Sequence, residues 1–232
     1  MNKKHLNIAI DGPSGAGKST LAKAIAKKMN ISYVDTGAIY RTVGYAARRE
    51  GIEPTDRAAV CALLPRISVE ARFEDGAQYM YLDGENLGER IREHEISHYA
   101  SAVSAIPEVR QFLFDMQRSI AAQNSVVMDG RDIGTVILPN ADVKIFLVAT
   151  AHDRAERRYK ELLERGQSAV FEKILADIEE RDARDSSRDV APLKPAEDAV
   201  LLDNSGFTPD ESLEAVLKIL DEKLNLGGND EE

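Results

Sequence analysis

A glycine-rich loop between an apolar run and a helical stretch constrains this chain more than any other feature. The loop, GPSGAGKS (12–19), matches the pattern G-x-x-x-x-G-K-[ST]. It follows the apolar run LNIAID (6–11), which is typical of a strand, and it opens KSTLAKAIAKKM (18–29), whose apolar residues recur at helical spacing. A strand, a tight turn and a helix in this order direct consecutive backbone N–H groups toward one point at a helix N-terminus. The sequence therefore predicts a phosphate-binding loop after the first strand.

The residues of this loop have expected roles in holding a nucleotide. Gly12, Gly15 and Gly17 let the backbone curl so that its N–H groups point at phosphate oxygens. Lys18 is expected to reach the β- and γ-phosphates, and Ser19 offers a hydroxyl to Mg²⁺. We therefore predict ATP and Mg²⁺ as ligands of this loop. The predicted ATP-binding residues are Gly12, Pro13, Ser14, Gly15, Ala16, Gly17, Lys18, Ser19 and Thr20, with Ser19 as the metal ligand.

Composition narrows the class of protein to which the loop belongs. The 232 residues include 40 acidic and 30 basic side chains, a formal net charge of -10, which argues against a general nucleic-acid surface. Cys61 is the single cysteine, so no intramolecular disulfide can form and a reducing compartment is favoured. The longest apolar runs, such as VKIFLVA (143–149), are too short to span a bilayer. We therefore expect a cytoplasmic protein with no nucleic-acid or membrane partner.

Short apolar segments recur along the chain and alternate with helical stretches. After the first strand they are ISYVD (31–35), SVVMDG (125–130), VKIFLVA (143–149) and AVLLDNS (199–205). This rhythm is typical of parallel strands buried under helices, and it predicts an α/β fold with a mainly parallel five-stranded sheet. The segment 66–91 breaks the rhythm, because its Asp-Gly pairs favour tight hairpin turns. We expect a small antiparallel insertion there.

The stretch ERDARDSSRD (180–189) places three arginines among acidic residues. On a helix, Arg181, Arg184 and Arg188 would form one stripe at i, i+3 and i+7. One interpretation is a solvated helix that pairs its own charges. The other is an arginine cluster for a phosphate-bearing ligand, and the stretch alone leaves both open.

A phosphate-binding loop of this kind does not identify the reaction, because the same fold carries kinases, switches and motors. The chain lacks the Asn/Thr-Lys-x-Asp element of a guanine-specific switch. Its strand VVMDG ends in Asp129 and Gly130 and not in the paired acids of a motor ATPase. Scattered arginines, among them Arg41, Arg110 and Arg131, suit a second phosphorylated substrate instead.

Five motifs, in this order along the chain, resemble those of bacterial cytidylate kinases (CMP kinases). They are DGPSGAGKST, DTGAIYR, SAVSAIPEVR, DGRDIGTV and ERDARDSSR, of which DTGAIYR and DGRDIGTV together are the specific ones. The resemblance implies a three-layer P-loop nucleoside monophosphate (NMP) kinase fold as one domain over residues 1–232. It implies an NMP-binding insertion at about 66–91 and a helical lid at about 152–190. It also implies a monomeric, Mg²⁺-dependent enzyme that transfers a phosphoryl group from ATP to CMP or dCMP, giving CDP or dCDP.

The same resemblance implies roles for side chains that recognise the acceptor nucleoside. Ser101, Arg110 and Asp132 match the residues that recognise cytosine, while Arg181 and Asp185 match those near the ribose. Chemistry supports this assignment, since a carboxylate accepts a hydrogen bond from the cytosine amine but meets a carbonyl in uracil.

Other side chains are implied to bind phosphate. Arg41, Arg131 and Arg188 match the phosphate-binding arginines, and Thr36 keeps the hydroxyl of the serine found in many members. Asp129 is expected at the site, either as an outer-shell acid of Mg²⁺ or as a hydrogen-bond anchor for the loop. The implied catalytic residues are Lys18, Arg131 and Arg188. The implied substrate-binding residues are Thr36, Arg41, Ser101, Arg110, Asp129, Arg131, Asp132, Arg181, Asp185 and Arg188.

Two alternatives to a cytidylate kinase remain open at this point. The first is a kinase for another small acceptor, such as a different nucleoside monophosphate or shikimate. The second is a nucleotide-regulated binding protein that has no acceptor substrate. An assay of ADP release with a panel of acceptors separates the three.

Overall fold

A five-stranded sheet, in the order β2-β6-β1-β7-β8, carries the phosphate-binding loop. It is seen in a computed structural model that describes residues 5–74, 76–164 and 166–224. The pairs β1–β7 and β7–β8 are parallel, which confirms the predicted α/β fold with a mainly parallel sheet. The strands are β1 (Asn7–Asp11), β2 (Ser32–Asp35), β6 (Val126–Gly130), β7 (Val143–Val148) and β8 (Val200–Asp203).

The chain divides into two units, and the sequence of unit 1 is inserted into that of unit 2. Unit 1 contains His5 and Ile31–Val126, and unit 2 contains Leu6–Asn30 and the residues from Val127 onward. Each unit has its own buried side chains. Within the described ranges, none of the helices has the combination of length and apolar character that crossing a membrane requires.

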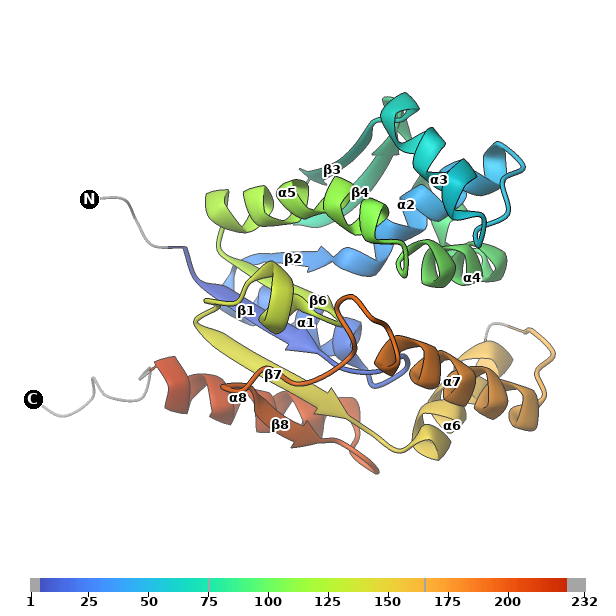
Figure 1. The fold of residues 1–232 in the computed structure, drawn as a ribbon. Coiled ribbons are helices and arrows are strands. Elements are labelled where there is room, and N and C mark those ends of the chain that lie inside the picture. The colour runs from blue at the N-terminus through green and yellow to red at the C-terminus, as the bar shows by residue number, and fades with distance from the viewer. Residues whose placement is uncertain (1–4, 75, 165, 225–232) are drawn as a thin grey trace, which may run out of the picture. The chain divides into compact units, whose positions relative to one another are not determined.

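Unit 2 is built around β1, β7 and β8, which run side by side (Figure 1). Ile8 and Ile10 of β1 and Ile25 of the first helix are completely buried, which explains why the β1 segment reads as an apolar run. α1 and α8 pack against each other, and α6 packs against α7. The helices of unit 2 are α1 (Lys18–Met29), the short π-helix η3 (Ile133–Ile137), α6 (Ala151–Glu164), α7 (Phe171–Ser186) and α8 (Pro209–Leu224).

Unit 1 contains the predicted antiparallel insertion. A three-stranded antiparallel sheet is formed by β3 (Val69–Glu74), β4 (Ala77–Leu82) and β5 (Glu85–Asn86), and the Asp83-Gly84 pair makes the turn before β5. The apolar core of this unit includes Ile39, Val43, Ile96 and Val103, all completely buried. The helices are α2 (Thr36–Arg49), α3 (Arg57–Leu63), η1 (Leu64–Arg66), η2 (Gly88–Arg92), α4 (His94–Val103) and α5 (Pro107–Gln123).

Candidate active site

The predicted phosphate-binding loop lies between β1 and α1, as the strand, loop and helix pattern requires. Gly12 has a φ of 148°, and a Cβ atom there would lie 2.1 Å from the carbonyl oxygen of Leu147. A side chain at this position would therefore collide with β7. Gly17, with a φ of 89°, caps the N-terminus of α1 in the left-handed conformation. The loop is thus held close to the sheet, and it leads directly into a helix N-terminus.

Three side chains bind carbonyl groups of the loop. Lys18, within the loop, donates to Pro13 (2.6 Å), while Arg154 and Asn204, from outside it, donate to Ser14 (2.9 Å) and Ala16 (3.1 Å). A peptide group whose carbonyl is bonded on one side cannot rotate freely, so its N–H keeps one direction. The loop is therefore preorganised by its own lysine and by two donors, Arg154 and Asn204, that lie far along the chain.

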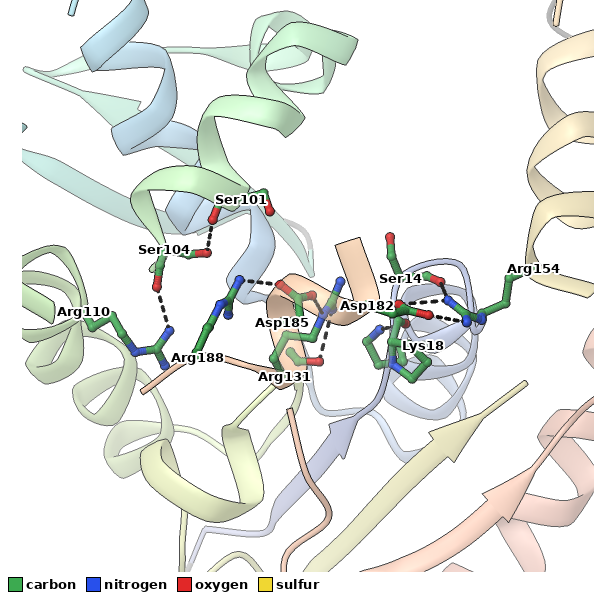
Figure 2. Close-up of polar contacts among 12 residues, drawn as sticks. Ser14, Lys18, Ser101, Ser104, Arg110, Arg131, Arg154, Asp182, Asp185 and Arg188 are labelled. Carbon is green, nitrogen blue, oxygen red and sulfur yellow. Dashed lines mark hydrogen bonds and ion pairs between the residues drawn. The ribbon is translucent and has the colours of Figure 1, made fainter. Parts of the chain in front are cut away.

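Arg154 connects this loop to two helices. Its side chain is buried, and Nη1 donates both to the carbonyl of Ser14 and, at 3.1 Å, to Asp182 on α7. Nη2 makes a second bond to Asp182 (Figure 2). Because Arg154 belongs to α6, one guanidinium joins the loop, α6 and α7.

Lys18 is buried among charged side chains of unit 2. Burial lowers the pKa of Lys18 well below its usual value, and the nearby guanidinium groups of Arg131 and Arg181 lower it further. The carboxylates of Asp129 and Asp11 act in the opposite direction. Burial and these two guanidinium groups outweigh the carboxylates in their effect on the pKa, so the charged form of Lys18 is disfavoured until a polyphosphate supplies further negative charge.

Ser19, the last residue of the loop, and Asp129 of β6 bring two oxygen atoms together that could bind a metal ion. Ser19 Oγ donates to Asp129 Oδ2 at 2.9 Å, and Asp129 is buried at the end of β6. Hydroxyl and carboxylate oxygens suit Mg²⁺, which proteins commonly hold through one or two carboxylates together with substrate phosphates. The two residues therefore fit a magnesium ion, and the hydrogen bond also makes Asp129 an anchor for the loop.

A carboxylate shared by two arginines lies in the same unit. Arg131 Nε donates to Asp185 Oδ2 at 2.9 Å, and Arg188 Nη2 donates to Asp185 Oδ1 (Figure 2). The side chains of Asp185 and Arg188 are only 2% and 7% exposed. Although burial opposes the charge of Asp185, the guanidinium groups of Arg131, Arg188 and Arg181 lower its pKa. Several guanidinium groups thus surround one buried anion.

The charged stretch 180–189 contains arginines in two kinds of surroundings. Arg184 pairs with Glu180 on an exposed part of α7, as a solvated helix would. The prediction that Arg188 shares one helix face with Arg181 and Arg184 is wrong. α7 ends at Ser186, and Arg188 lies beyond it. Serine and aspartate favour helix ends, since their side chains compete for backbone hydrogen bonds. Arg188 nevertheless reaches back to Asp185.

Unit 1 brings together two residues of the predicted cytosine site. Ser104 Oγ donates to the carbonyl of Ser101 at 2.9 Å, and Arg110 Nη1 donates to the carbonyl of Ser104 at 3.2 Å (Figure 2). The Arg110 guanidinium also lies 5.6 Å from the ring centroid of Tyr40. The third predicted residue, Asp132, belongs to unit 2, where it is buried and precedes η3.

The motif DTGAIYR forms the junction of β2 and α2 in unit 1. Asp35 caps α2 by accepting from the Ala38 N–H at 2.9 Å, and Arg41 Nη2 donates to the same carboxylate at 2.7 Å. A Cβ at Gly37 would lie 2.9 Å from Arg41 Nη1, so glycine makes room for the guanidinium. Thr36, the first residue of the helix, is buried. The N-terminus of α2 and the guanidinium group of Arg41 together form a site that suits an anion.

Several of these residues were not predicted from the sequence. The role of Asp35 as the N-cap of α2 could have been predicted, because aspartate is a preferred residue directly before a helix. Gly37 belongs to the motif DTGAIYR, but the motif alone does not show that this glycine makes room for Arg41. Arg154, Asn204 and Asp11 had no local signal, because their partners lie more than 100 residues away along the chain.

Comparison with known proteins identifies the family. The family model described as "Cytidylate kinase" matches residues 8–222. A cytidylate kinase of Caldicellulosiruptor bescii is 46% identical over 216 residues, which are 93% of this chain and 96% of that protein. A cytidylate kinase of Streptococcus agalactiae is 47% identical over 219 residues, which are 94% of this chain and 95% of that protein.

A solved structure of low identity shares the fold. The crystal structure of an uncharacterized protein from Eubacterium ventriosum has a TM-score of 0.55 and 14% identity, and the likeness covers 95% of this chain and 99% of that one. The family model and the two relatives each span nearly the whole sequence, including the loop and the arginine motifs. The chain therefore belongs to the cytidylate kinase family.

Proposed function

We propose that the protein transfers the γ-phosphoryl group of ATP to CMP or dCMP, giving ADP and CDP or dCDP, with Mg²⁺ as cofactor. The observation that carries this proposal is the match to proteins named cytidylate kinase at 46% and 47% identity over nearly the whole chain. Such an enzyme is a nucleoside monophosphate kinase. The phosphate-binding loop and the buried cations of unit 2 support the same reaction.

The donor nucleotide is bound by the loop. Its backbone N–H groups and the N-terminus of α1 hold the phosphates, and Lys18 neutralises charge on the β- and γ-phosphates. Ser19 and Asp129 would hold Mg²⁺, which when bound supplies further positive charge and orients the phosphates. Bound phosphates would add to the negative charge that Asp129 and Asp11 place near the ammonium group of Lys18.

Specificity for cytosine is assigned to three side chains. Asp132 accepts from the exocyclic amine, while Arg110 and Ser101 contact the ring acceptors. Uracil would present a carbonyl to the Asp132 carboxylate, and this mismatch disfavours UMP. Arg181 and Asp185 are assigned to the ribose.

The acceptor phosphate and the transition state are assigned to arginines. Arg41, Arg131 and Arg188 neutralise charge as the phosphoryl group moves, with Thr36 at the first turn of α2. Arg41 Nε is buried and has no hydrogen-bond partner among the residues that the structure describes, which supports an anionic ligand there. Phosphoryl transfer through a loose transition state requires little covalent help, so no general base is assigned.

The parts of the chain follow the same assignment. The insertion at about 66–91 belongs to the NMP-binding part, and the segment at about 152–190, which contains α6 and α7, acts as a lid. A lid that closes on substrates would exclude water that otherwise hydrolyses ATP. The proposal further includes a monomer that acts in the cytoplasm without a nucleic-acid or membrane partner.

A coupled assay of ADP release with several acceptors tests the proposal. CMP, dCMP, UMP, AMP, GMP and shikimate are each supplied with MgATP. We expect CMP and dCMP to give the fastest ADP release, with UMP slower by about ten- to a hundredfold, as a mispaired buried polar group predicts. Faster release with AMP, GMP or shikimate would make the protein a kinase for another acceptor. Release with none of them would leave a nucleotide-regulated binding protein.

A further inference from the structure

Asp11 joins the end of β1 to the segment that carries Arg131 and Asp132. It is the last residue of β1, directly before the phosphate-binding loop, and its side chain is buried. Oδ1 accepts from the N–H of Ile133 at 2.8 Å and Oδ2 from the N–H of Gly134 at 2.7 Å. These N–H groups begin η3, immediately after Arg131 and Asp132.

The chemistry of this contact requires a carboxylate. The first N–H groups of a helix have no partner within the helix, and a buried N–H without a partner is costly. A carboxylate offers two acceptor oxygens and donates nothing, so one ionised side chain satisfies both N–H groups with charge-assisted bonds. An asparagine of the same size has one acceptor and turns an NH₂ donor toward the second N–H. No loop or helix role assigned so far uses this side chain.

The charges around Asp11 come from several elements. Burial raises the pKa of Asp11 to about 7 although the two N–H bonds act in the opposite direction. Asp132, just before η3, raises it further, and Lys18 of α1 lowers it. The aliphatic part of the Lys144 side chain, from β7, also lies beside Gly134, but its ammonium group bonds to Asp198 and to the Pro139 carbonyl. Asp129 of β6 accepts from Ser19. The carboxyl group therefore changes charge near neutral pH.

We propose that Asp11 is a positioning residue: its ionised carboxylate fixes the backbone of Ile133 and Gly134 and thereby holds Arg131 and Asp132 in the geometry that binds the acceptor. This inference rests on the proposed function, which assigns Arg131 and Asp132 to the acceptor nucleotide. Asp11 itself touches no substrate. Protonation removes one of its two good acceptors, so the segment after β6 loosens while the sheet remains intact.

Asp11→Asn tests the role in catalysis, with Asp142→Asn as the matched control. Asp142 accepts from the N–H of Asn7 at 3.0 Å, so it makes a similar bond at the opposite end of β1. We expect Asp11→Asn to lower kcat/KM for CMP by at least about tenfold, mainly through KM for CMP, with KM for ATP changed less than about threefold.

For the unaltered protein and for Asp142→Asn, kcat/KM should rise with pH through about 7. In Asp11→Asn this rise should be reduced to the part that titration of CMP itself contributes.

A second measurement needs no variant and no turnover. Amide hydrogen exchange at Ile133 and Gly134, corrected for intrinsic rates, should show protection that decreases as pH falls below about 7, while protection in β7 stays constant. Protection at Ile133 and Gly134 that does not depend on pH would overturn the proposal. So would an Asp11→Asn variant that keeps the full pH dependence or weakens CMP and ATP alike. Absence of CMP phosphorylation by the unaltered protein would instead refute the proposed function, and the exchange measurement would still judge the contact.

Discussion

Arg184 and Arg188 belong to one charged stretch, but their side chains have different surroundings. Arg188 is 7% exposed and shares Asp185 with Arg131. Arg184 is 35% exposed and pairs with Glu180, which is 70% exposed. A surface ion pair contributes about 0–1 kcal/mol, whereas a buried cation near a transferring phosphoryl group acts directly on the transition state. The sequence presents two equivalent arginines, and the structure separates them.

We therefore predict that alanine substitutions at these positions diverge. Arg188→Ala should lower kcat/KM with CMP and MgATP by at least about a hundredfold, because it removes charge that the proposed transition state requires. Arg184→Ala, the matched control, should cost less than about tenfold. Thermal melts of both variants should lie close to that of the unaltered protein. Equally small losses in both would mean that Arg188 serves no ligand.

At the level of elements, Arg154 of α6 links the phosphate-binding loop to α7. The same guanidinium donates to the Ser14 carbonyl and to the Asp182 carboxylate. If Asp182 loses its charge, Arg154 remains buried with a weaker partner and its hold on the loop is less well defined. The neighbouring pair of Glu180 and Arg184 is more exposed to solvent than Arg154 and Asp182.

Asp182→Asn should therefore weaken the binding of ATP, although Asp182 lies on α7 and not in the phosphate-binding loop. We expect KM for ATP to rise about three- to tenfold, with Glu180→Gln as a control that changes it less than about twofold. Isothermal titration with a non-hydrolysable ATP analogue measures the same effect without turnover. Unchanged affinity for the analogue in Asp182→Asn would show that the loop is held without this contact.

Elements were predictable from the sequence because their signals are local. The five strands, the loop and the antiparallel insertion follow from apolar runs, glycines and Asp-Gly pairs within short windows. The end of α7 before Arg188 was missed, because spacing alone does not reveal where a helix stops. The contacts of Asp11 and Arg154 were missed for a different reason. Each joins segments more than 100 residues apart, and no local pattern records such a pairing.

For the whole molecule, the buried carboxyl of Asp11 links folding to pH. Its pKa is about 7 in the folded protein and 3.8 as the ordinary value. Between pH 3.8 and about pH 7, Asp11 holds a proton in the folded protein but has released it in the unfolded chain. This group therefore lowers the free energy of unfolding as pH rises through that range. Asp185 acts in the opposite sense, because its lowered pKa contributes stability that is lost only as pH falls into the acid range.

Thermal melts of the unaltered protein and Asp11→Asn across pH 5 to 7.5 test this linkage. Each pKa unit corresponds to about 1.4 kcal/mol in the free energy of unfolding. The Tm of Asp11→Asn minus the Tm of the unaltered protein should therefore increase by several degrees from pH 5 to pH 7.5. The gain should level off above the pKa of Asp11. Two curves that stay parallel throughout would show that Asp11 titrates normally.

The most direct test of the whole account is the fate of the phosphoryl group of ATP labelled with ³²P at the γ position. In the presence of CMP and Mg²⁺, we predict that the label appears in the β-phosphate of CDP and that little appears as inorganic phosphate. Lys18→Ala should fold normally but transfer almost no label, because the proposed role of Lys18 is to neutralise the phosphates undergoing transfer. Label that stays in ATP, or that appears only as inorganic phosphate, would contradict a cytidylate kinase reaction in this protein.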